Sequence, residues 1–522
     1  MISRPVLIAG AGPTGLALAC GLRAHDVPVR VVDRAACPAV TSRALGLQPR
    51  GAEVIDRLGA LGDLPSRSLA VHQVVIHLGG REIGRLSVGK PTRLVRRPGL
   101  LVSQAEIEGE LRRRLGELGG TVEWGREVVA LATDADADAG GVTVRLGGEV
   151  DGDEVVTAGW VAGCDGAHSR VRKAAGVGFP GVPLVERFLL ADVRAELPLA
   201  RDSVAVWLDG DDLVAAFPLP GPDRWRLMAP DPDPSAERGG SGDDMAVLAQ
   251  LTELLELRSG LPAGSVHEAL WTSTFRFHRR LADTYRAGRV LLAGDAAHIH
   301  SPFGGQGLNT GIGDAENLAW KLALVCTGRA GPALLDTYES ERRPVAEEVL
   351  ASTSGITRLV LGGSAAARLM RDHVLVPLMN RPLVQRLIWE QASQLRISYR
   401  GGPLAGRGLP LSGPRPGDRV PDLACSAADG SLTRLHAELG SGWAMIAADP
   451  ALLETCADAV SAWLGVDRLA RLTPLSGAPR GALLVRPDAH LAWRGTDPAA
   501  VRRWLTAALN RADPTRPLAS AG

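Results

Sequence analysis

The segment from Val290 to Val325 holds the residues with the clearest chemical purpose. An apolar stretch leads into Gly294-Asp295, and a Gln and an Asn then follow among the glycines Gly304, Gly305, Gly307 and Gly311. Apolar residues recur at helical spacing from 313 to 325, so the pattern predicts a strand, a glycine-rich loop and a helix. Because a carboxylate at a helix N-terminus would repel a phosphate, we expect Asp295 to accept a hydrogen bond from a sugar hydroxyl. A turn capped by an Asp is the simpler alternative, and the number of glycines favours a cofactor site.

The N-terminal segment carries a second glycine-rich loop. The apolar stretch Val6–Ala9 is followed by Gly10-Ala-Gly12-Pro13-Thr14-Gly15 and a helix from 16 to about 25, and the next strand, Val29–Asp33, ends in an acid. In a dinucleotide fingerprint the first glycine makes the tight turn and the second lets the backbone approach a pyrophosphate. The third lets helix and strand pack closely, and the acid binds ribose hydroxyls. Asp33 would repel a 2′-phosphate, so we expect a nucleotide of the NAD or FAD type.

Further candidate residues follow other predicted elements. A strand ending near Cys164 precedes Asp165-Gly166 and a short basic helix to Arg172, which alone is typical of a tight strand-to-helix turn. Arg43 and Arg50 follow the second strand, where a guanidinium could clamp a pyrophosphate. A solvated surface arginine is the alternative, and it is equally plausible for Arg50. Gln104 is expected at the start of a helix that Ser103 caps.

Composition narrows the class of protein. A chain of 522 residues allows two or three domains, and 58 basic against 58 acidic residues give a net charge of zero. This balance gives no sign of nucleic acid or an anionic membrane as a partner. The six cysteines are scattered without a CxxC or a His-Cys cluster, and no stretch approaches a membrane span. We therefore expect a cytoplasmic protein with no disulfide framework and no metal site.

The middle and the end of the chain differ from the glycine-rich segments in hydrophobic pattern and composition. Residues 180–285 alternate between apolar and polar and predict an antiparallel sheet, in which we expect a substrate platform. Four side chains could line it, although each is more often an ordinary core residue: Phe217, Trp225, Met228 and Phe275. Helical sequence reaches about Arg396, a stretch rich in Gly and Pro follows to Asp422, and the remaining residues have strands of their own.

Together the three glycine-rich segments resemble those of a known family. Gly10-x-Gly12-x-x-Gly15, the block from Cys164 to Arg172, and Gly294-Asp295 with Pro302 to Gly307 match, in order and spacing, the fingerprints of the class A flavin-dependent monooxygenases, which share the para-hydroxybenzoate hydroxylase-like fold. The C-terminal extension resembles that of the phenol hydroxylase and aromatic polyketide hydroxylase branch.

The fold that the resemblance implies is α/β. It has a Rossmann-type FAD-binding domain at 1–178 and 276–398, which includes buttressing helices. An inserted antiparallel-sheet substrate domain occupies 179–275. A linker at 399–422 leads to a C-terminal thioredoxin-like domain at 423–522.

The resemblance also implies roles for single residues. Gly10, Gly12 and Gly15 would lie along the FAD pyrophosphate, Asp33 would hold the adenosine ribose, and Asp295 would bind the ribityl chain. The loop with Pro302, Gly304 and Gly305 would lie nearest the isoalloxazine ring, and no catalytic side chain is assigned. The full expected FAD-binding set is Gly10, Gly12, Pro13, Thr14, Gly15, Asp33, Arg34, Arg43, Gln104, Asp165, Gly294, Asp295, Pro302, Gly305, Gly307, Leu308 and Asn309.

The implied chemistry belongs to the cofactor. NADPH or NADH, bound transiently, would reduce FAD; O2 would add at flavin C4a; and the hydroperoxide would transfer one oxygen atom to an aromatic, polycyclic polyketide substrate in a water-poor pocket. Baeyer-Villiger or epoxidising oxygenation of a polyketide ketone or quinone is the alternative enzyme activity. The non-enzymatic alternative is a flavin-binding interaction protein. A monomer or a homodimer is expected.

Overall fold

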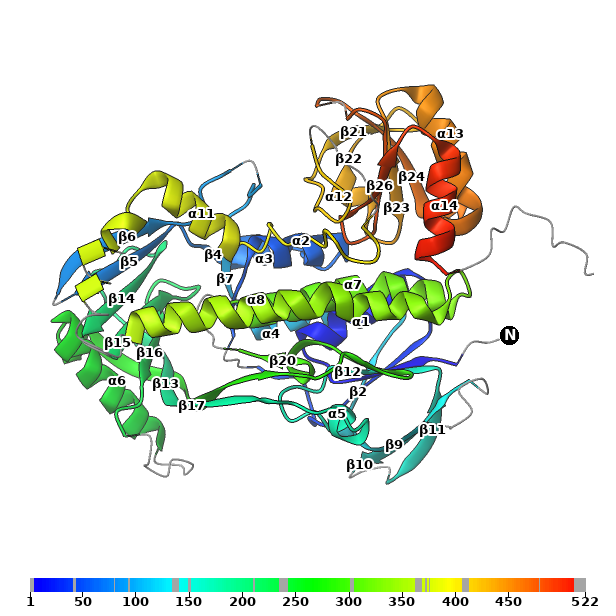
Figure 1. The fold of residues 1–522 in the computed structure, drawn as a ribbon. Coiled ribbons are helices and arrows are strands. Elements are labelled where there is room, and N and C mark those ends of the chain that lie inside the picture. The colour runs from blue at the N-terminus through cyan, green and yellow to red at the C-terminus, as the bar shows by residue number, and fades with distance from the viewer. Residues whose placement is uncertain are drawn as a thin grey trace, which may run out of the picture.

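The fold is built mainly on three sheets, each with helices packed against it (Figure 1). The computed structural model describes residues 4–40, 44–78, 80–92, 94–133, 140–148, 152–209, 212–233, 243–300, 305–361, 369–370, 373–374, 376–405, 413–477 and 479–510. No helix within these ranges is long and apolar enough to cross a bilayer.

The first sheet is mostly parallel. In order across the sheet its strands are β18 (Arg286–Ala287), β19 (Val290–Leu292), β12 (Trp160–Gly163), β1 (Val6–Ala9), β2 (Val29–Asp33) and β8 (Val122–Trp124). Strand β1 pairs in parallel with β2 and β12, and β12 pairs in parallel with β19. Strands β1, β12 and β19 are buried throughout, as expected for parallel strands covered on both faces. The expected strands at 6–9 and 29–33 are confirmed.

Helices cover this sheet and continue beyond it. They are α1 (Pro13–Ala24), α2 (Pro49–Arg57), α3 (Leu64–Arg67), α4 (Gln104–Glu117), α5 (Arg170–Ala174), α7 (Gly307–Cys326) and α8 (Asp336–Leu361). Helix α7 begins six residues earlier than the sequence pattern suggested, so Leu308 and Asn309 lie in its first turn. Helix α8 packs on α7 near one end and reaches β15 and β17 of the second sheet near the other (Figure 1).

The second sheet has eight strands and is largely antiparallel. Its order is β20 (His298–Ile299), β17 (Val266–Leu281), β13 (Gly181–Ala195), β16 (Arg224–Pro230), β15 (Asp212–Pro218), β14 (Ser203–Asp209), β5 (Gln73–Leu78) and β6 (Arg81–Ser87). The expected insertion at 179–275 is therefore too narrow, because β14 pairs with β5 from an earlier part of the chain. Strand β17 also runs on to Leu281 and pairs with β20. Helix α6 (Asp243–Ser259) covers one face of this sheet.

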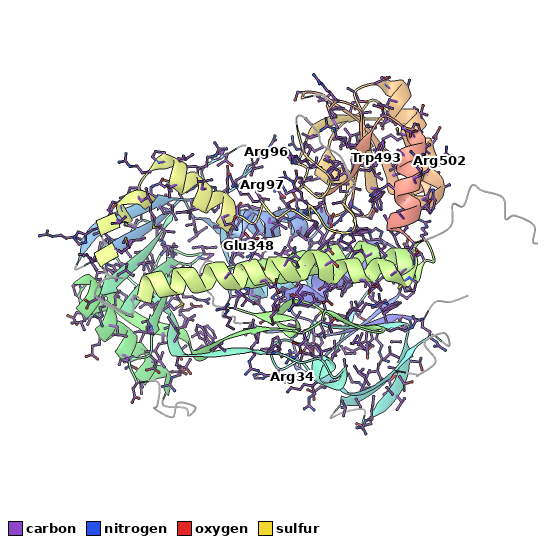
Figure 2. All side chains as sticks on the ribbon, in the orientation of Figure 1. Arg34, Arg96, Arg97, Glu348, Trp493 and Arg502 are labelled. Atoms are coloured by element: carbon purple, nitrogen blue, oxygen red, sulfur yellow. The ribbon has the colours of Figure 1, made fainter. Side chains whose placement is uncertain are left out.

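The third sheet lies in the C-terminal part, which we define as residues 413–510. Its order is β22 (Leu432–Arg434), β21 (Ala424–Ala427), β24 (Leu469–Pro474), β23 (Trp443–Ile446), β25 (Ala482–Val485) and β26 (Leu491–Gly495), with helices α12 (Leu435–Glu438), α13 (Pro450–Leu464) and α14 (Pro498–Ala508). The C-terminal part lies over α7 (Figure 1), and Figure 2 marks Trp493 and Arg502 within it. The Trp320 ring of α7 meets the Trp443 ring edge-on at 5.3 Å, so α7 shares one apolar core with this part.

Smaller elements complete the described chain. Two three-stranded sheets consist of β9 (Arg126–Thr133), β10 (Val142–Gly148) and β11 (Glu154–Ala158), and of β3 (Leu45–Leu47), β4 (Leu69–Ala70) and β7 (Leu100–Ser103). Further helical segments are η1 (Ala263–Ser265), η2 (Gly294–Ala296), η3 (Pro332–Leu335), α10 (Val376–Met379), α11 (Pro382–Ala392) and η5 (Val466–Arg468).

Buried charges also hold the C-terminal part to the helices. Glu341 of α8 accepts hydrogen bonds from Lys321 of α7 at 2.8 Å and from Arg486 of the C-terminal part at 2.6 Å. Arg486 pairs in turn with Asp488, and all four side chains are almost fully buried. Burial alone would raise the pKa of Glu341, but the charges of Arg486 and Lys321 lower it from 4.5 to about 2. The ion cluster therefore requires an ionised Glu341.

We expect Glu341→Gln to lower the free energy of unfolding by about 3–5 kcal/mol, because it leaves two buried cations without their shared carboxylate. The pKa of Glu341 in the folded protein lies below its ordinary value of 4.5. The contribution of Glu341 to the free energy of unfolding is therefore complete above pH 4.5 and is lost as the pH falls through about 2. Urea unfolding between pH 7 and pH 2 measures this dependence, which should be weaker in the variant. The half-exposed pair of Arg471 and Glu454 offers the control Glu454→Gln, with an expected change of about 0.5 kcal/mol or less.

Candidate functional site

Three loops meet at one edge of the first sheet, because they follow the neighbouring parallel strands β1, β12 and β19. A Cβ atom built on Gly10 would lie 2.3 Å from the Cys164 carbonyl oxygen and 2.9 Å from the Asp165 amide nitrogen. A Cβ atom on Gly294 would lie 2.5 Å from Oγ1 of Thr14. The three segments that the sequence singled out are therefore in direct contact.

The glycines of the first loop differ in their surroundings. Gly10 has a φ of +102° and lies against the loop that follows β12. A Cβ atom on Gly15 would lie 2.0 Å from the Gly10 carbonyl oxygen, whereas no described atom lies within 4 Å of a Cβ atom on Gly12. Gly10 and Gly15 thus serve the packing of the chain, while Gly12, directly before α1 and Pro13, leaves the helix N-terminus accessible to an anion.

The expected cofactor-binding residues after β2 and at the start of α4 make different contacts. The Asp33 carboxylate accepts hydrogen bonds from the amides of Ala11 at 2.7 Å and Ala35 at 2.8 Å, which fixes it beside the glycine loop. Arg34 is exposed at the surface (Figure 2). Gln104 begins α4 and donates to Glu108 at 2.7 Å. The expected residues Arg43, Pro302 and Gly304 lie outside the described residues.

Asp165 has one satisfied and one unsatisfied oxygen. Its Oδ2 accepts from the amides of Arg170 at 2.7 Å and Val171 at 3.1 Å, at the start of α5. Its Oδ1 is buried and has no hydrogen-bond partner among the described residues. A buried carboxylate oxygen without a donor is costly, so this atom fits a site where a bound group supplies a hydroxyl or an amide.

Asp295 is the acid of the third loop. Its side chain is accessible to solvent, yet the protein atoms crowded around it raise the pKa of its carboxyl group, and His298 opposes that shift. An accessible carboxylate beside glycine-rich backbone fits a ligand rich in hydroxyl groups, which can donate to it without bringing a negative charge.

A buried carboxylate that the sequence analysis did not identify organises this third loop. Asp314 of α7 accepts a hydrogen bond from the Gly294 amide at 3.1 Å and pairs with Nε2 of His298 at 2.6 Å. Its other oxygen accepts from Nε of Arg342 at 2.7 Å. Burial alone would raise the pKa of Asp314, but His298 and Arg342 hold it below its ordinary value. The available signal was the pair of acids, Asp314 and Glu316, among the mostly apolar and small residues of α7.

The end of the third loop is fixed by Asn309. Its side-chain oxygen accepts from the Gln48 amide at 2.8 Å, and its side-chain nitrogen donates to the Gly305 carbonyl at 2.8 Å. Asn309 is buried, and Leu308 beside it packs against the core of the first sheet. A Cβ atom on Gly307 would lie 3.1 Å from the His300 ring. Asn309 therefore shapes the loop, and the backbone of Gly305 and Gly307 remains the part able to face a ligand.

The four expected substrate residues do not share one face of the second sheet. Phe217, Met228 and Phe275 lie in one cluster, where the rings of Phe275 and Phe188 stack with centroids 6.3 Å apart. Trp225 lies on the opposite face, 1% exposed, in the core beneath α6. The assignment of Trp225 is therefore corrected, because side chains alternate between the faces of a strand and Trp225 is three residues from Met228.

Alanine at Gly12 and alanine at Gly15 should have opposite effects. Gly15→Ala places a methyl group against a backbone oxygen, and we expect it to lower the free energy of unfolding by about 3 kcal/mol. Gly12→Ala has room and an ordinary φ of −74°, so the apoprotein should keep its stability while the affinity for a dinucleotide falls. Urea unfolding and titration with FAD separate the two results. Unchanged FAD affinity in Gly12→Ala would contradict the assignment of this loop.

Comparison with known proteins agrees with this geometry. The family model described as "FAD binding domain" matches residues 3–353, and the one described as "Aromatic-ring hydroxylase, C-terminal" matches residues 413–512. The chain is 38% identical to 6-methylpretetramide 4-monooxygenase of Streptomyces rimosus over 81% of its length and 74% of the relative's. It is 36% identical to rifampicin monooxygenase of Streptomyces venezuelae over 94% of this chain and 96% of that one.

Solved structures give the same result. An aromatic hydroxylase from angucycline biosynthesis matches with a TM-score of 0.79 and 31% identity, covering 98% of this chain and 100% of that one. A ternary complex of aklavinone-11 hydroxylase with FAD and aklavinone matches with a TM-score of 0.80 and 28% identity, covering 97% and 99%. The protein belongs to the FAD-dependent aromatic-ring hydroxylases, a family of monooxygenases.

Proposed function

We propose that this enzyme binds FAD where the three loops meet and hydroxylates a polycyclic aromatic polyketide, with NADPH or NADH as reductant and O2 as the source of oxygen. The proposal rests on the contacts between three distant segments. Gly10 lies against Cys164 and Asp165, and Gly294 lies against Thr14. FAD would supply the electron transfer and the activation of oxygen, which no amino-acid side chain can provide.

The residues around the site suit the parts of FAD in turn. The N-terminus of α1, with Gly12, Pro13 and Thr14, would face the pyrophosphate, and Asp33 would face the adenosine ribose. Asp165 Oδ1 would accept from a hydroxyl or an amide of the nucleotide, and Asp295 would accept from the ribityl hydroxyls. Backbone groups from Gly305 to Asn309, at the start of α7, would lie near the ring, where the positive end of the helix favours electron density.

The substrate chamber would lie against the face of the second sheet that carries Phe217, Met228 and Phe275. Strand β17 holds Phe275 and continues to Leu281, which pairs with His298 just after the Gly294-Asp295 turn. One continuous strand thus connects the apolar face with the cofactor loop. An apolar wall would exclude water and hold flat aromatic rings by stacking.

Hydroxylation is favoured over the other activities considered above. The C-terminal family model and the angucycline and aklavinone relatives are all named as hydroxylases, whereas none of these names indicates Baeyer-Villiger oxidation or epoxidation. A flavin-binding interaction protein is disfavoured by the family to which the chain belongs. Several expectations stay predictions. They are the Rossmann-type character of the first sheet, the thioredoxin-like character of the third sheet, the oligomeric state and the cytoplasmic location.

The test is oxidation of NADPH and NADH under air by the FAD-reconstituted enzyme, with a panel of polycyclic phenols and quinones. Substrate-stimulated oxidation with a product that carries one new hydroxyl group on an unchanged carbon skeleton supports hydroxylation. A lactone or an epoxide supports the alternative. Failure to consume O2 with any member of the panel would contradict both.

Phe275→Ala should impair substrate binding without loss of the cofactor. Truncating an aromatic side chain that contacts the ligand costs about 1–3 kcal/mol, so KM should rise roughly tenfold or more, and more NAD(P)H should be oxidised without product. Trp225→Phe is the control on the other face, and it should change stability but leave KM within about twofold. Steady-state rates with product quantification measure both variants. Equal changes in KM would show that the chamber lies elsewhere.

A further inference from the structure

A line of buried polar contacts connects the C-terminal part with the cofactor loop. We call it the relay and define it as Gly294, Asp314, Arg342 and Tyr399. Asp314 accepts from the Gly294 amide at 3.1 Å, and Nε of Arg342 donates to Asp314 at 2.7 Å. Nη1 of Arg342 then donates to the Tyr399 hydroxyl at 3.0 Å. The relay therefore ends on the amide next to Asp295.

Arg342 is held in one orientation by three partners. Besides Asp314 and Tyr399, it donates through Nη2 to the Thr310 carbonyl of α7 at 3.0 Å. The side chain is buried, and its planar guanidinium fixes the directions of all three hydrogen bonds. Such bonds are stronger in a buried site than at the surface, so we expect the loss of one partner to let the guanidinium tilt and to shift the carboxylate of Asp314.

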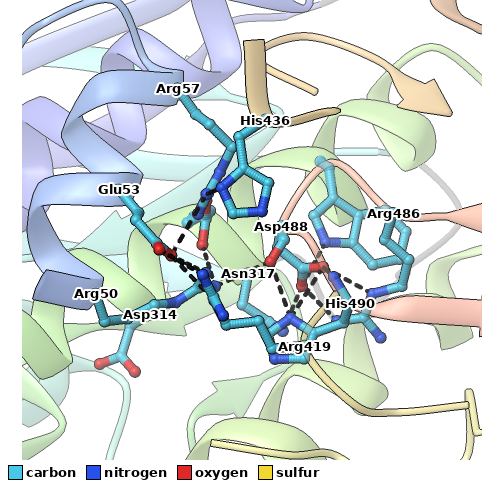
Figure 3. A network of polar contacts seen from close by, with 12 residues as sticks. Arg50, Glu53, Arg57, Asp314, Asn317, Arg419, His436, Arg486, Asp488 and His490 are labelled. Carbon is cyan, nitrogen blue, oxygen red and sulfur yellow. Dashed lines mark hydrogen bonds and ion pairs between the residues drawn. The ribbon is translucent and has the colours of Figure 1, made fainter. Parts of the chain in front are cut away.

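The C-terminal part sets the position of Tyr399. The Tyr399 amide donates to the Gly417 carbonyl at 2.8 Å, and the Tyr399 ring lies against the His490 ring with centroids 4.2 Å apart. His490 belongs to the Arg486 and Asp488 cluster, which Figure 3 shows close to Asn317 of α7. Asn317 lies three residues beyond Asp314 on the same helix. The position of the Tyr399 hydroxyl thus depends on Gly417 and His490 of the C-terminal part.

Other contacts across the same interface end elsewhere. Arg468 pairs with Asp26 beyond the end of α1, and Arg419 donates to Glu53 of α2 at 3.0 Å. Figure 3 shows the Arg419 and Glu53 pair with Arg50 and Arg57 on α2. Among the described residues, neither pair forms a hydrogen bond with Gly294 or Asp314. They hold the C-terminal part in place, whereas the relay reaches the loop itself.

We propose that Tyr399 and Arg342 are positioning residues, through which the C-terminal part holds the Gly294-Asp295 turn in the shape that binds FAD. The proposal rests on the FAD site proposed above. It gives the C-terminal part a role in cofactor retention, exerted through one hydroxyl and one guanidinium.

The decisive variant is Tyr399→Phe, which removes the hydroxyl and keeps the ring against His490. Two matched controls separate the relay from general effects. Tyr285→Phe removes another buried tyrosine hydroxyl, one with no hydrogen-bond partner among the described residues. Arg468→Met removes an interface ion pair outside the relay. The readouts are hydrogen-deuterium exchange of peptides covering residues 290–300 in the apoprotein, the Kd for FAD from quenching of flavin fluorescence, and the visible absorption spectrum of the bound flavin.

We expect Tyr399→Phe to speed exchange at 290–300, to raise the Kd for FAD about fivefold, as for the loss of one buried hydrogen bond, and to shift the flavin spectrum. Exchange of the β1 peptide and both control variants should match the wild type. In an Arg342→Gln background, Tyr399→Phe should add nothing. Wild-type exchange and wild-type Kd in Tyr399→Phe would overturn the proposal, and so would equal effects in Arg468→Met. If the wild type itself fails to bind FAD, the proposed function fails, while the exchange measurement still tests the relay.

Discussion

Parallel pairing of three short strands is the constraint on which the structure depends. Strands β1, β12 and β19 come from positions near 6, 160 and 290 of the chain, yet they are adjacent in one sheet. Parallel strands place their carboxyl ends at the same edge, so the three loops that follow them must converge. The close approach of Gly10 to Cys164, and of Gly294 to Thr14, requires residues without side chains at those points. The chemistry of the site follows from that geometry.

Buried charge organises the second level of the structure. Asp314 holds the third loop, and the ion pair of Glu341 with Arg486 holds the C-terminal part against α7 and α8. Buried ions add little net stability by themselves, but breaking one pair leaves the other charge uncompensated. Such groups therefore allow few alternative arrangements, and a site that must hold a large cofactor in one pose benefits from that restriction.

Local patterns predicted the first strands, the cap of α4 by Ser103 and the three loops, because spacing and residue type decide those features within a few residues. The inclusion of β5 in the second sheet could not be read from the sequence, since strand pairing between distant segments leaves no local signal. The orientation of Trp225 was missed for a related reason, because an apolar side chain suits either face of a covered sheet. The roles of Asp314 and Arg342 were missed because each depends on hydrogen-bond partners in other segments of the chain.

The position of Tyr399 after all of the site's own segments has a consequence for biogenesis. During synthesis the loops at 10–15, 164–169 and 293–298 leave the ribosome long before the residues that surround Tyr399 and His490. Non-local pairing of this kind folds slowly and exposes apolar surface while it is incomplete. We expect cofactor loading to be a late, post-translational event, and a nascent chain stalled before residue 400 to be a substrate for chaperones.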